Sequence, residues 1–288
     1  MSMIDYIREQ YAREHKLIHA ANIIKKYEDP RKNSTQQNAL DLIIPQYYEY
    51  LRCNNTLRGW DRTDILRRVD YVNQYYNFIR DQGFDNVFSA QGKFRPSILE
   101  EFIYLLFRDY INYLREKYNV GSDKIDCGQV KAYTNLFFKA KDFQEFVVAP
   151  KIGINVKDQD FAIYSEFELS IRGDREESIM VPVIAVEAKT FIDKTMLDSI
   201  IATAEKLKNG NPYTRFIAIA EHYDVGKEVD PAYSRIDQIY ILRKGRRRDE
   251  WRDIDANVVY RMFEDAKIHI ERPWSDIEAR LFNEGVIL

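Results

Sequence analysis

The sequence predicts an α/β (α+β) protein in which helices flank a mixed central β-sheet. Apolar residues recur at helical spacing through the first third of the chain, and strand-like segments fill its middle. One amphipathic helix separates two of those strands. With 288 residues, 45% of them hydrophobic, the chain can bury one large core or two modest ones. We therefore expect a helical region at 1–95, a core at 96–250 and a C-terminal helical segment at 251–288.

The N-terminal region is expected to be helical and to serve DNA recognition or dimerisation if the chain binds DNA. One helix covers residues 3–27, and a second begins at Ser34, whose hydroxyl can cap it. Pro45 is expected to kink that second helix or to split it in two. A third begins near Thr63 and stops near Gly83.

The clearest helix of the chain begins near Pro96, with Ser97 at its cap and a continuous apolar stripe. The stretches LFFKAK and FVVAP are expected to form a first strand pair that ends at Pro150. A further strand, DFAIYSEFELSI, begins at Asp160 and alternates apolar and polar residues. The turn RGDREES connects it to VPVIAVEAK, whose aliphatic run is typical of a buried strand.

A helix follows that buried strand, begun by Asp193 or Thr195 and ended just before Gly210. Two more apolar stretches, TRFIAIAEHY and IDQIYILRK, are expected to be strands. The tail, which carries Trp251 and Trp274, reads as helical again. The alternation of helices and strands predicts helices packed on a mixed sheet.

Composition excludes several classes of protein. No run of about 18 apolar residues exists, so no membrane span is expected. The start has no apolar signal core, and Cys53 and Cys127 lie far apart, which indicates reduced thiols in a cytoplasmic protein without structural zinc. His15 and His19 lack the glutamate of a zinc-protease motif. The net charge of −3 exerts no overall attraction on nucleic acid, so DNA binding would require local basic clusters.

The strand VPVIAVEAK ends in two opposite charges. Side chains alternate along a strand, so Glu187 and Lys189 point to one face and Ala188 to the other. Ionised groups are costly among apolar neighbours, so this pair must reach solvent, each other or an ion. One interpretation is simply a strand that emerges from the core into water.

Asp160 supports a second interpretation. If the two strands pair as a hairpin across RGDREES, Asp160 returns to the end of the strand that carries Glu187 and Lys189. Carboxylates, water and phosphate oxygens are the ligands that Mg²⁺ prefers. Two carboxylates with a lysine beside them are the parts required for metal-assisted hydrolysis of a phosphodiester.

This arrangement resembles the core of the PD-(D/E)xK nucleases: an acid, an apolar strand ending in Glu-Ala-Lys, an amphipathic helix and another apolar strand. Gln159 stands where the family usually has proline, and Asp158 and Glu168 are alternative acids. The resemblance implies a metal held by Asp160, Glu187 and the carbonyl of Ala188, with Lys189 beside the attacking water.

Many nucleases of this kind also carry a glutamate on the helix that precedes the sheet. The stretch SILEEF offers Glu100 and Glu101, which flank the apolar stripe about equally, so periodicity does not choose between them. We favour Glu101 as a fourth catalytic residue. The other interpretation is a solvated carboxylate in the first helical turn.

A narrower resemblance extends from Ser97 to Arg248. SILEEFIYLLF, KDQDFAI, VEAKTFIDKTML and the basic run after IYILR are together similar to BbvCI-type type II restriction endonucleases, which use two different subunits on an asymmetric site. The resemblance implies a Mg²⁺-dependent, sequence-specific endonuclease of double-stranded DNA, with one active site per subunit and a second subunit, identical or different. The alternatives are a repair or recombination nuclease of the same fold and a non-catalytic DNA-binding protein.

Two basic clusters are candidates for DNA binding. One is the basic run after the predicted strand IDQIYIL, which could instead be a solvated turn. The other is the group of arginines around Trp60, which could instead be the exposed charged face of a helix. Lys194 and Lys206 flank the helix after the Glu-Ala-Lys strand and are candidates for contact with backbone phosphate, although most lysines on helices are simply solvated. The run contains Arg243, Lys244, Arg246, Arg247 and Arg248, and the N-terminal cluster contains Arg58, Arg62, Arg67 and Arg68.

Overall fold

The structure is a computed structural model that describes residues 2–88, 94–171, 175–272, 274 and 277–285. Its N-terminal part is helical, as the sequence predicts, although several helix ends differ. These helices are α1 (Met3–Arg13), α2 (Ile18–Glu28), α3 (Ser34–Thr56), α4 (Arg62–Asp81) and the short η1 (Phe84–Asn86).

Local capping explains the differences in the helical region. The expected helix at 3–27 is two helices, and α3 continues through Pro45 instead of splitting there. Asn33, not Ser34, caps α3, because its side chain and that of Gln36 bond each other's backbone N–H groups in a capping box. Asp61 rather than Thr63 caps α4.

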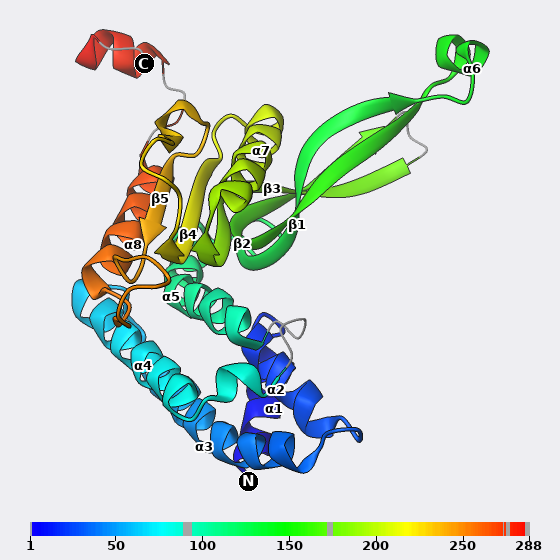
Figure 1. The fold of residues 1–288 in the computed structure, drawn as a ribbon. Coiled ribbons are helices and arrows are strands. Elements are labelled where there is room, and N and C mark those ends of the chain that lie inside the picture. The colour runs from blue at the N-terminus through cyan, green and yellow to red at the C-terminus, as the bar shows by residue number, and fades with distance from the viewer. Residues whose placement is uncertain (1, 89–93, 172–174, 273, 275–276, 286–288) are drawn as a thin grey trace.

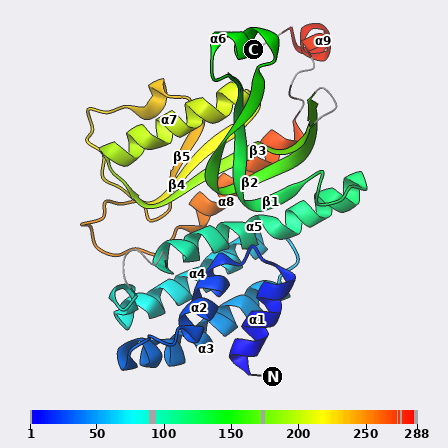
Figure 2. The ribbon, with the colours of Figure 1, turned by 90° about the vertical axis from the view of Figure 1, so that its right-hand side faces the viewer.

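Helix α5 (Phe94–Tyr118) lies between the helical region and the sheet (Figures 1 and 2). It is buried on all sides along most of its length, because helices cover one side of it and strands the other. Ser97 lies inside this helix, where its hydroxyl donates to the carbonyl of Phe94 (2.8 Å), and does not cap it. A single apolar cluster joins side chains of α1–α5 to those of the sheet.

The sheet is mixed, which confirms the predicted fold class. Its strands follow one another in chain order; the first three are antiparallel and the last three parallel. They are β1 (Asp126–Lys139), β2 (Lys151–Ile171), β3 (Arg175–Ile192), β4 (Arg215–Tyr223) and β5 (Gln238–Ile241).

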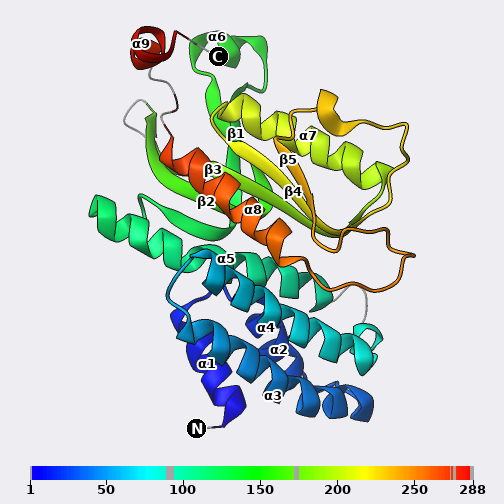
Figure 3. The same cartoon turned by 90° about the vertical axis from the view of Figure 1, so that its left-hand side faces the viewer.

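Helices cover both faces of the sheet (Figure 3). The crossover helix α7 (Lys194–Gly210) packs on one face, in a cluster with Ala185 and Phe216. Helices α5 and α8 (Ala256–Glu271) pack on the other, in the large cluster with Val186. The chain ends in the short helices α9 (Ile277–Ala279) and η4 (Arg280–Glu284). Among the described residues, every helix is too short or too polar to cross a bilayer.

Strands β1 and β2 extend beyond the sheet as a two-stranded arm, residues 133–156, with helix α6 (Phe143–Val148) at its tip (Figure 1). The stretch FVVAP was expected to be a strand and is instead mostly α6. Asp142 explains the difference, because its side chain accepts the N–H of Glu145 (2.8 Å) and so begins a helix. Over this arm, β1 pairs with β2, which begins at Lys151.

The cap of α7 gives a test of how this helix is held beside the end of β3. Asp193 accepts the N–H of Met196 (2.8 Å), whereas Thr195 lies inside the helix. We expect Asp193→Ala to lower the free energy of unfolding by about 1 kcal/mol and Asp193→Asn to lower it by a few tenths, roughly. Urea unfolding would measure both. A larger loss in Thr195→Ala than in Asp193→Ala would contradict this assignment.

Candidate active site

The pairing of β2 with β3 brings Asp160 to the end of the Glu-Ala-Lys strand, as the sequence predicts. The antiparallel ladder reaches Phe161 opposite Val186, and the pairing of β1 with β2 shifts register next to this point. Beyond the ladder, the carboxylate of Asp160 accepts the backbone N–H of Ala188 (2.9 Å). The Asp160 side chain therefore accepts a hydrogen bond from β3 just beyond the last paired residues of the two strands. The pairing of β2 with β3 keeps the side chain in this position.

Lys189 joins the two carboxylates. Its Nζ lies 3.2 Å from Oδ2 of Asp160 and 2.7 Å from Oε1 of Glu187. Desolvation alone would lower the pKa of the Lys189 ammonium, but the charges of Asp160 and Glu187 outweigh it and raise that pKa. The side chains are 30%, 25% and 15% exposed for Lys189, Asp160 and Glu187, so water and a substrate can still reach them.

The donor set fits a magnesium ion that retains much of its water. Asp160 and Glu187 supply two carboxylates within reach of one point, and Mg²⁺ is usually bound by one or two carboxylates plus water and substrate phosphate. Within the described parts of the chain, no cluster of three acidic, histidine or cysteine side chains is placed to hold a metal. A site here is therefore open and would be completed by oxygens from elsewhere, including the carbonyl of Ala188.

The alternative acids lie away from Lys189. Asp158 is exposed and stands opposite Lys131 in the β1–β2 ladder. Glu168 is exposed opposite Ser178, towards the far end of the β2–β3 hairpin. Asp160 is therefore the candidate acid of β2.

The expectation that Glu101 joins this site is wrong. Glu187 and Lys189 share the strand face of Ala185, which packs on α7, whereas α5 packs on the opposite face with Val186 and Ala188. Glu101 points away from the sheet into the helical region.

There the Glu101 carboxylate accepts the backbone N–H groups of His19 (2.8 Å) and Ala20 (3.0 Å) and the hydroxyl of Tyr47 (2.7 Å). These are first-turn amides of α2, which has no side-chain cap of its own, so Glu101 replaces the cap. Glu100 also faces a neighbour: it accepts from the side chain of Gln129 on β1 (2.8 Å).

The basic run after β5 is divided by burial. The expectation that Arg243 binds DNA is wrong, because its side chain is fully buried, pairs with Glu221 (2.8 Å) and lies 3.8 Å from the ring centre of Trp251. Lys244, Arg247 and Arg248 are exposed, and Arg246 is half-buried.

Their contacts place these side chains near the ends of β3 and β4. The Arg247 guanidinium lies over the ring of Phe191 on β3 (4.2 Å) and 3.7 Å from Asp224. Lys244 pairs with Asp255 (2.5 Å). Arg246, Arg247 and Arg248 line a cavity of about 250 Å³ together with Asp224.

The N-terminal cluster is also divided. Arg68 is buried and pairs with Asp109 (2.5 Å), so it is a core residue and not a DNA contact. Trp60 packs on Tyr113 and Tyr110. Lys194, by contrast, is exposed at the start of α7.

Sequence reasoning missed the buried ion-pair chain in which Arg243 takes part. Glu221 accepts from both Arg243 and Arg95 (3.1 Å), and Arg95 also pairs with Asp85 (3.1 Å). The sequence contains a sign of this ion pair, because Glu221 lies near the end of the apolar strand RFIAIAEHY just as Glu187 lies near the end of VPVIAVEAK. These ion pairs connect helices and loops to β4 on the face of the sheet that α5 covers.

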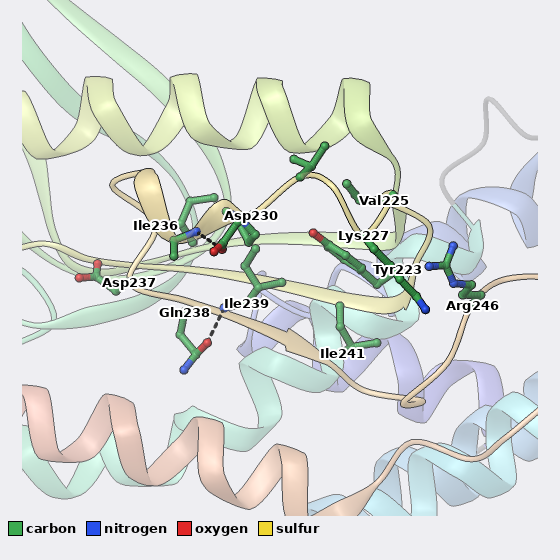
Figure 4. A pocket seen from close by; sticks show the side chains of 14 residues that line it. Tyr223, Val225, Lys227, Asp230, Ile236, Asp237, Gln238, Ile239, Ile241 and Arg246 are labelled. Carbon is green, nitrogen blue, oxygen red and sulfur yellow. Dashed lines mark hydrogen bonds between the residues drawn. The ribbon is translucent and has the colours of Figure 1, made fainter.

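A large cavity lies elsewhere (Figure 4). It has a volume of about 890 Å³ and lies between the edge strand β5 and the loop at 224–237. Apolar side chains such as Ile236, Ile239 and Ile241 line its centre, with Lys227 and Arg246 towards one end. None of the three charged side chains at the strand ends lines it, so it is separate from the candidate active site.

Comparisons with known proteins identify the family and the fold of the chain. Residues 91–277, well over half of the chain, match the model of a family described as Bpu10I restriction endonuclease. A solved structure of the native BbvCI A2B2 tetramer has a similar fold, with a TM-score of 0.69 and 19% identity over 91% of this chain and 99% of that one. No curated protein sequence matches the chain.

Glu101 provides a test of its structural role. Glu101→Ala would leave two backbone N–H groups and a hydroxyl buried without an acceptor, so we expect a loss of about 3 kcal/mol in the free energy of unfolding. Glu101→Gln retains an oxygen for both amides and can donate to Tyr47, so it should lose less than about 1.5 kcal/mol. Chemical unfolding would compare them, and equal losses would contradict the capping role.

The pH dependence of the stability difference between Glu101→Gln and the wild type is a second test. Burial raises the pKa of Glu101 to about 7 from an ordinary value of 4.5, against the opposing effect of its three donors. Between these values the folded protein binds a proton that the unfolded chain has released, so this group's contribution to stability falls as pH rises through the window. The stability of Glu101→Gln relative to the wild type should therefore rise from pH 4.5 to pH 7. A pH-independent difference would contradict it.

Proposed function

Because the chain belongs to the Bpu10I restriction endonuclease family, and so is a subunit of a sequence-specific type II DNA endonuclease, we propose that Asp160, Glu187 and Lys189 form its active site. The observation that supports this most directly is the shared ammonium, which joins two carboxylates from neighbouring strands at an accessible strand end. Restriction endonucleases generally use a divalent metal. We further propose that Mg²⁺ is the metal here.

In this proposal Asp160 and Glu187 hold the ion, with the carbonyl of Ala188 and water. When bound, the ion supplies Lewis acidity to the phosphate and lowers the pKa of the attacking water. The N–H of Ala188 keeps Asp160 in position through its hydrogen bond. Lys189 orients the water and neutralises charge that develops on the phosphate oxygens, and its raised pKa keeps it protonated for this role.

The exposed basic side chains would position the DNA. We propose that Lys194, Arg246, Arg247 and Arg248 contact backbone phosphates, because they surround the ends of β3 and β4 on the same side of the molecule as the start of α7. Lys244 would add to this surface if its pairing with Asp255 is exchanged for phosphate. Local clusters of this kind are required because the chain as a whole is acidic.

A single site cuts a single strand, so we propose that the chain acts with a second endonuclease subunit. The assembly of the structurally similar BbvCI, an A2B2 tetramer, supports this. Family membership favours restriction over a repair function or non-catalytic binding. We also propose a cytoplasmic location, consistent with the free thiols of Cys53 and Cys127.

Removal of the charged groups tests the active site. We expect Glu187→Gln and Lys189→Ala to lower the rate of plasmid cleavage at least about a hundredfold, because the metal and the developing charge lose their partners. Folding and DNA affinity should remain. The measurement is conversion of supercoiled plasmid to nicked or linear product with Mg²⁺, with EDTA, and with the partner subunit.

Two carboxylates serve as matched controls for that experiment. Glu168→Gln on β2 and Glu101→Gln on α5 should both retain cleavage, because neither contacts Lys189. If Lys189→Ala cleaves as fast as these controls do, the assignment of the active site is wrong.

A pair of arginines tests the DNA surface. Arg248→Ala should weaken DNA binding and reduce the slope of log affinity against log salt by about one contact. Arg243→Ala should instead lower the free energy of unfolding by about 3 kcal/mol, because it removes one of the two arginines that neutralise the buried Glu221. Filter binding across a salt series would measure the first effect and urea unfolding the second. If Arg248→Ala lowered stability and Arg243→Ala weakened only DNA binding, the assignment of Arg248 to the DNA surface and of Arg243 to the core would be wrong.

A further inference from the structure

The cavity between β5 and the loop at 224–237 lies on the same face of the sheet as the candidate active site. Lys189 on β3 is paired with Ala220 on β4, and Ala220 is paired with Ile241 on β5. Residues paired in this way point to one face, and adjacent strands are about 4.8 Å apart. The apolar floor of the cavity therefore begins about 10 Å from the backbone of Lys189.

The apolar face of the sheet is open along β5. Ala218 and Ala220 on β4 are fully buried beneath α7, whereas Ile239 and Ile241 on β5 are only partly buried and line the cavity. Tyr223, the last residue of β4, adds an aromatic ring to the lining. A volume of about 890 Å³ with an apolar centre is typical of sites that enclose a small organic ligand.

One end of this cavity is positively charged, because Lys227 and Arg246 both lie there (Figure 4). The two acidic side chains of the lining have partners in the protein. Asp230 accepts a backbone N–H of its own loop (2.9 Å), and Asp237 pairs with Lys208 (2.6 Å). A ligand that combines an anionic group with a planar apolar body fits this arrangement of charge and apolar surface.

Arg246 connects the cavity to the surface that we assign to DNA. It lines both the large cavity and the smaller one that it shares with Arg247 and Arg248. Each nucleotide of a bound duplex carries a phosphate anion and a planar base. The base can enter a cavity only by leaving the helical stack, and contacts with an aromatic ring and with cations can offset that cost.

We propose that the cavity receives one nucleotide extruded from the bound DNA near the cleaved phosphodiester. Its base lies over Ile239 and beside Tyr223, and its phosphate lies between Lys227 and Arg246. This inference rests on the proposed function, because it requires duplex DNA on the exposed basic side chains. Extrusion makes cleavage depend on how readily one base pair opens, so it adds selectivity beyond direct contacts with base edges.

The fluorescence of a modified duplex tests this proposal. The cleavage position is first mapped on plasmid DNA with the wild-type chain and its partner subunit. Duplexes that span this position then carry 2-aminopurine, whose fluorescence rises when it leaves the stack, at one position at a time. After rapid mixing with the enzyme and Mg²⁺, we expect a severalfold rise at one position before product forms. Normal cleavage without a rise at any position would overturn the proposal.

Two variants connect the fluorescence rise to the cavity. Ile239→Trp fills the cavity, so it should abolish the rise and slow cleavage about tenfold by displacing the substrate. Tyr233→Trp is its matched control, because Tyr233 is 73% exposed on η3 (Pro231–Tyr233) and lies outside the lining. Lys227→Glu should reduce the rise by repelling phosphate. Arg235→Glu makes the same charge change in the same loop outside the cavity and should leave the rise intact.

The outcomes of these variants are distinguishable. A full rise in folded Ile239→Trp or in Lys227→Glu would place the extruded base elsewhere and overturn the proposal. If thermal unfolding shows that Ile239→Trp does not fold, Lys227→Glu decides the result. Lys189→Ala should lose cleavage and retain the rise, because Lys189 does not line the cavity. If Lys189→Ala instead cleaves at the wild-type rate, the active-site assignment fails, whereas the rise still decides the role of the cavity.

Discussion

The antiparallel pairing of β2 with β3 is the constraint on which the candidate active site depends. It brings together residues that are 27 positions apart in the chain and ends where the Asp160 carboxylate takes over the hydrogen bond to Ala188. Lys189 then reaches both Asp160 and Glu187. A slip of the register by one residue would turn every side chain of β3 to the opposite face and separate these charges.

Helix α5 sets the limits of that site. Because it is enclosed by α-helices on one side and by the sheet on the other, its polar residues must find partners inside the protein. Glu101 does so by capping α2, and Asp109 does so by pairing with Arg68. These buried contacts attach the helical region to the sheet. Helix α5 therefore has a structural role on the face of the sheet opposite Glu187.

Two glutamates near the ends of apolar strands differ in burial and in their charged partners. Glu187 remains partly exposed and shares an ammonium with Asp160, so its surroundings can exchange with water and ligand oxygens. Glu221 is fully buried, and Arg243 and Arg95 neutralise it from two directions. The pattern of an apolar strand ending in an acid therefore identifies a charge that requires a partner. Whether that partner is internal or external depends on which face of the sheet the acid occupies and on what covers it.

The sequence alone determined the mixed sheet flanked by helices and the meeting of Asp160 with Glu187 and Lys189, because period-two alternation and hairpin connection are local properties of the chain. It did not determine which of the adjacent Glu100 and Glu101 faces the sheet, or that Arg243 is buried while Arg248 is exposed. Neighbouring residues with similar local patterns differ there only through contacts with distant elements. Tertiary packing decided those assignments, because burial and charge pairing depend on what the fold places against each side chain.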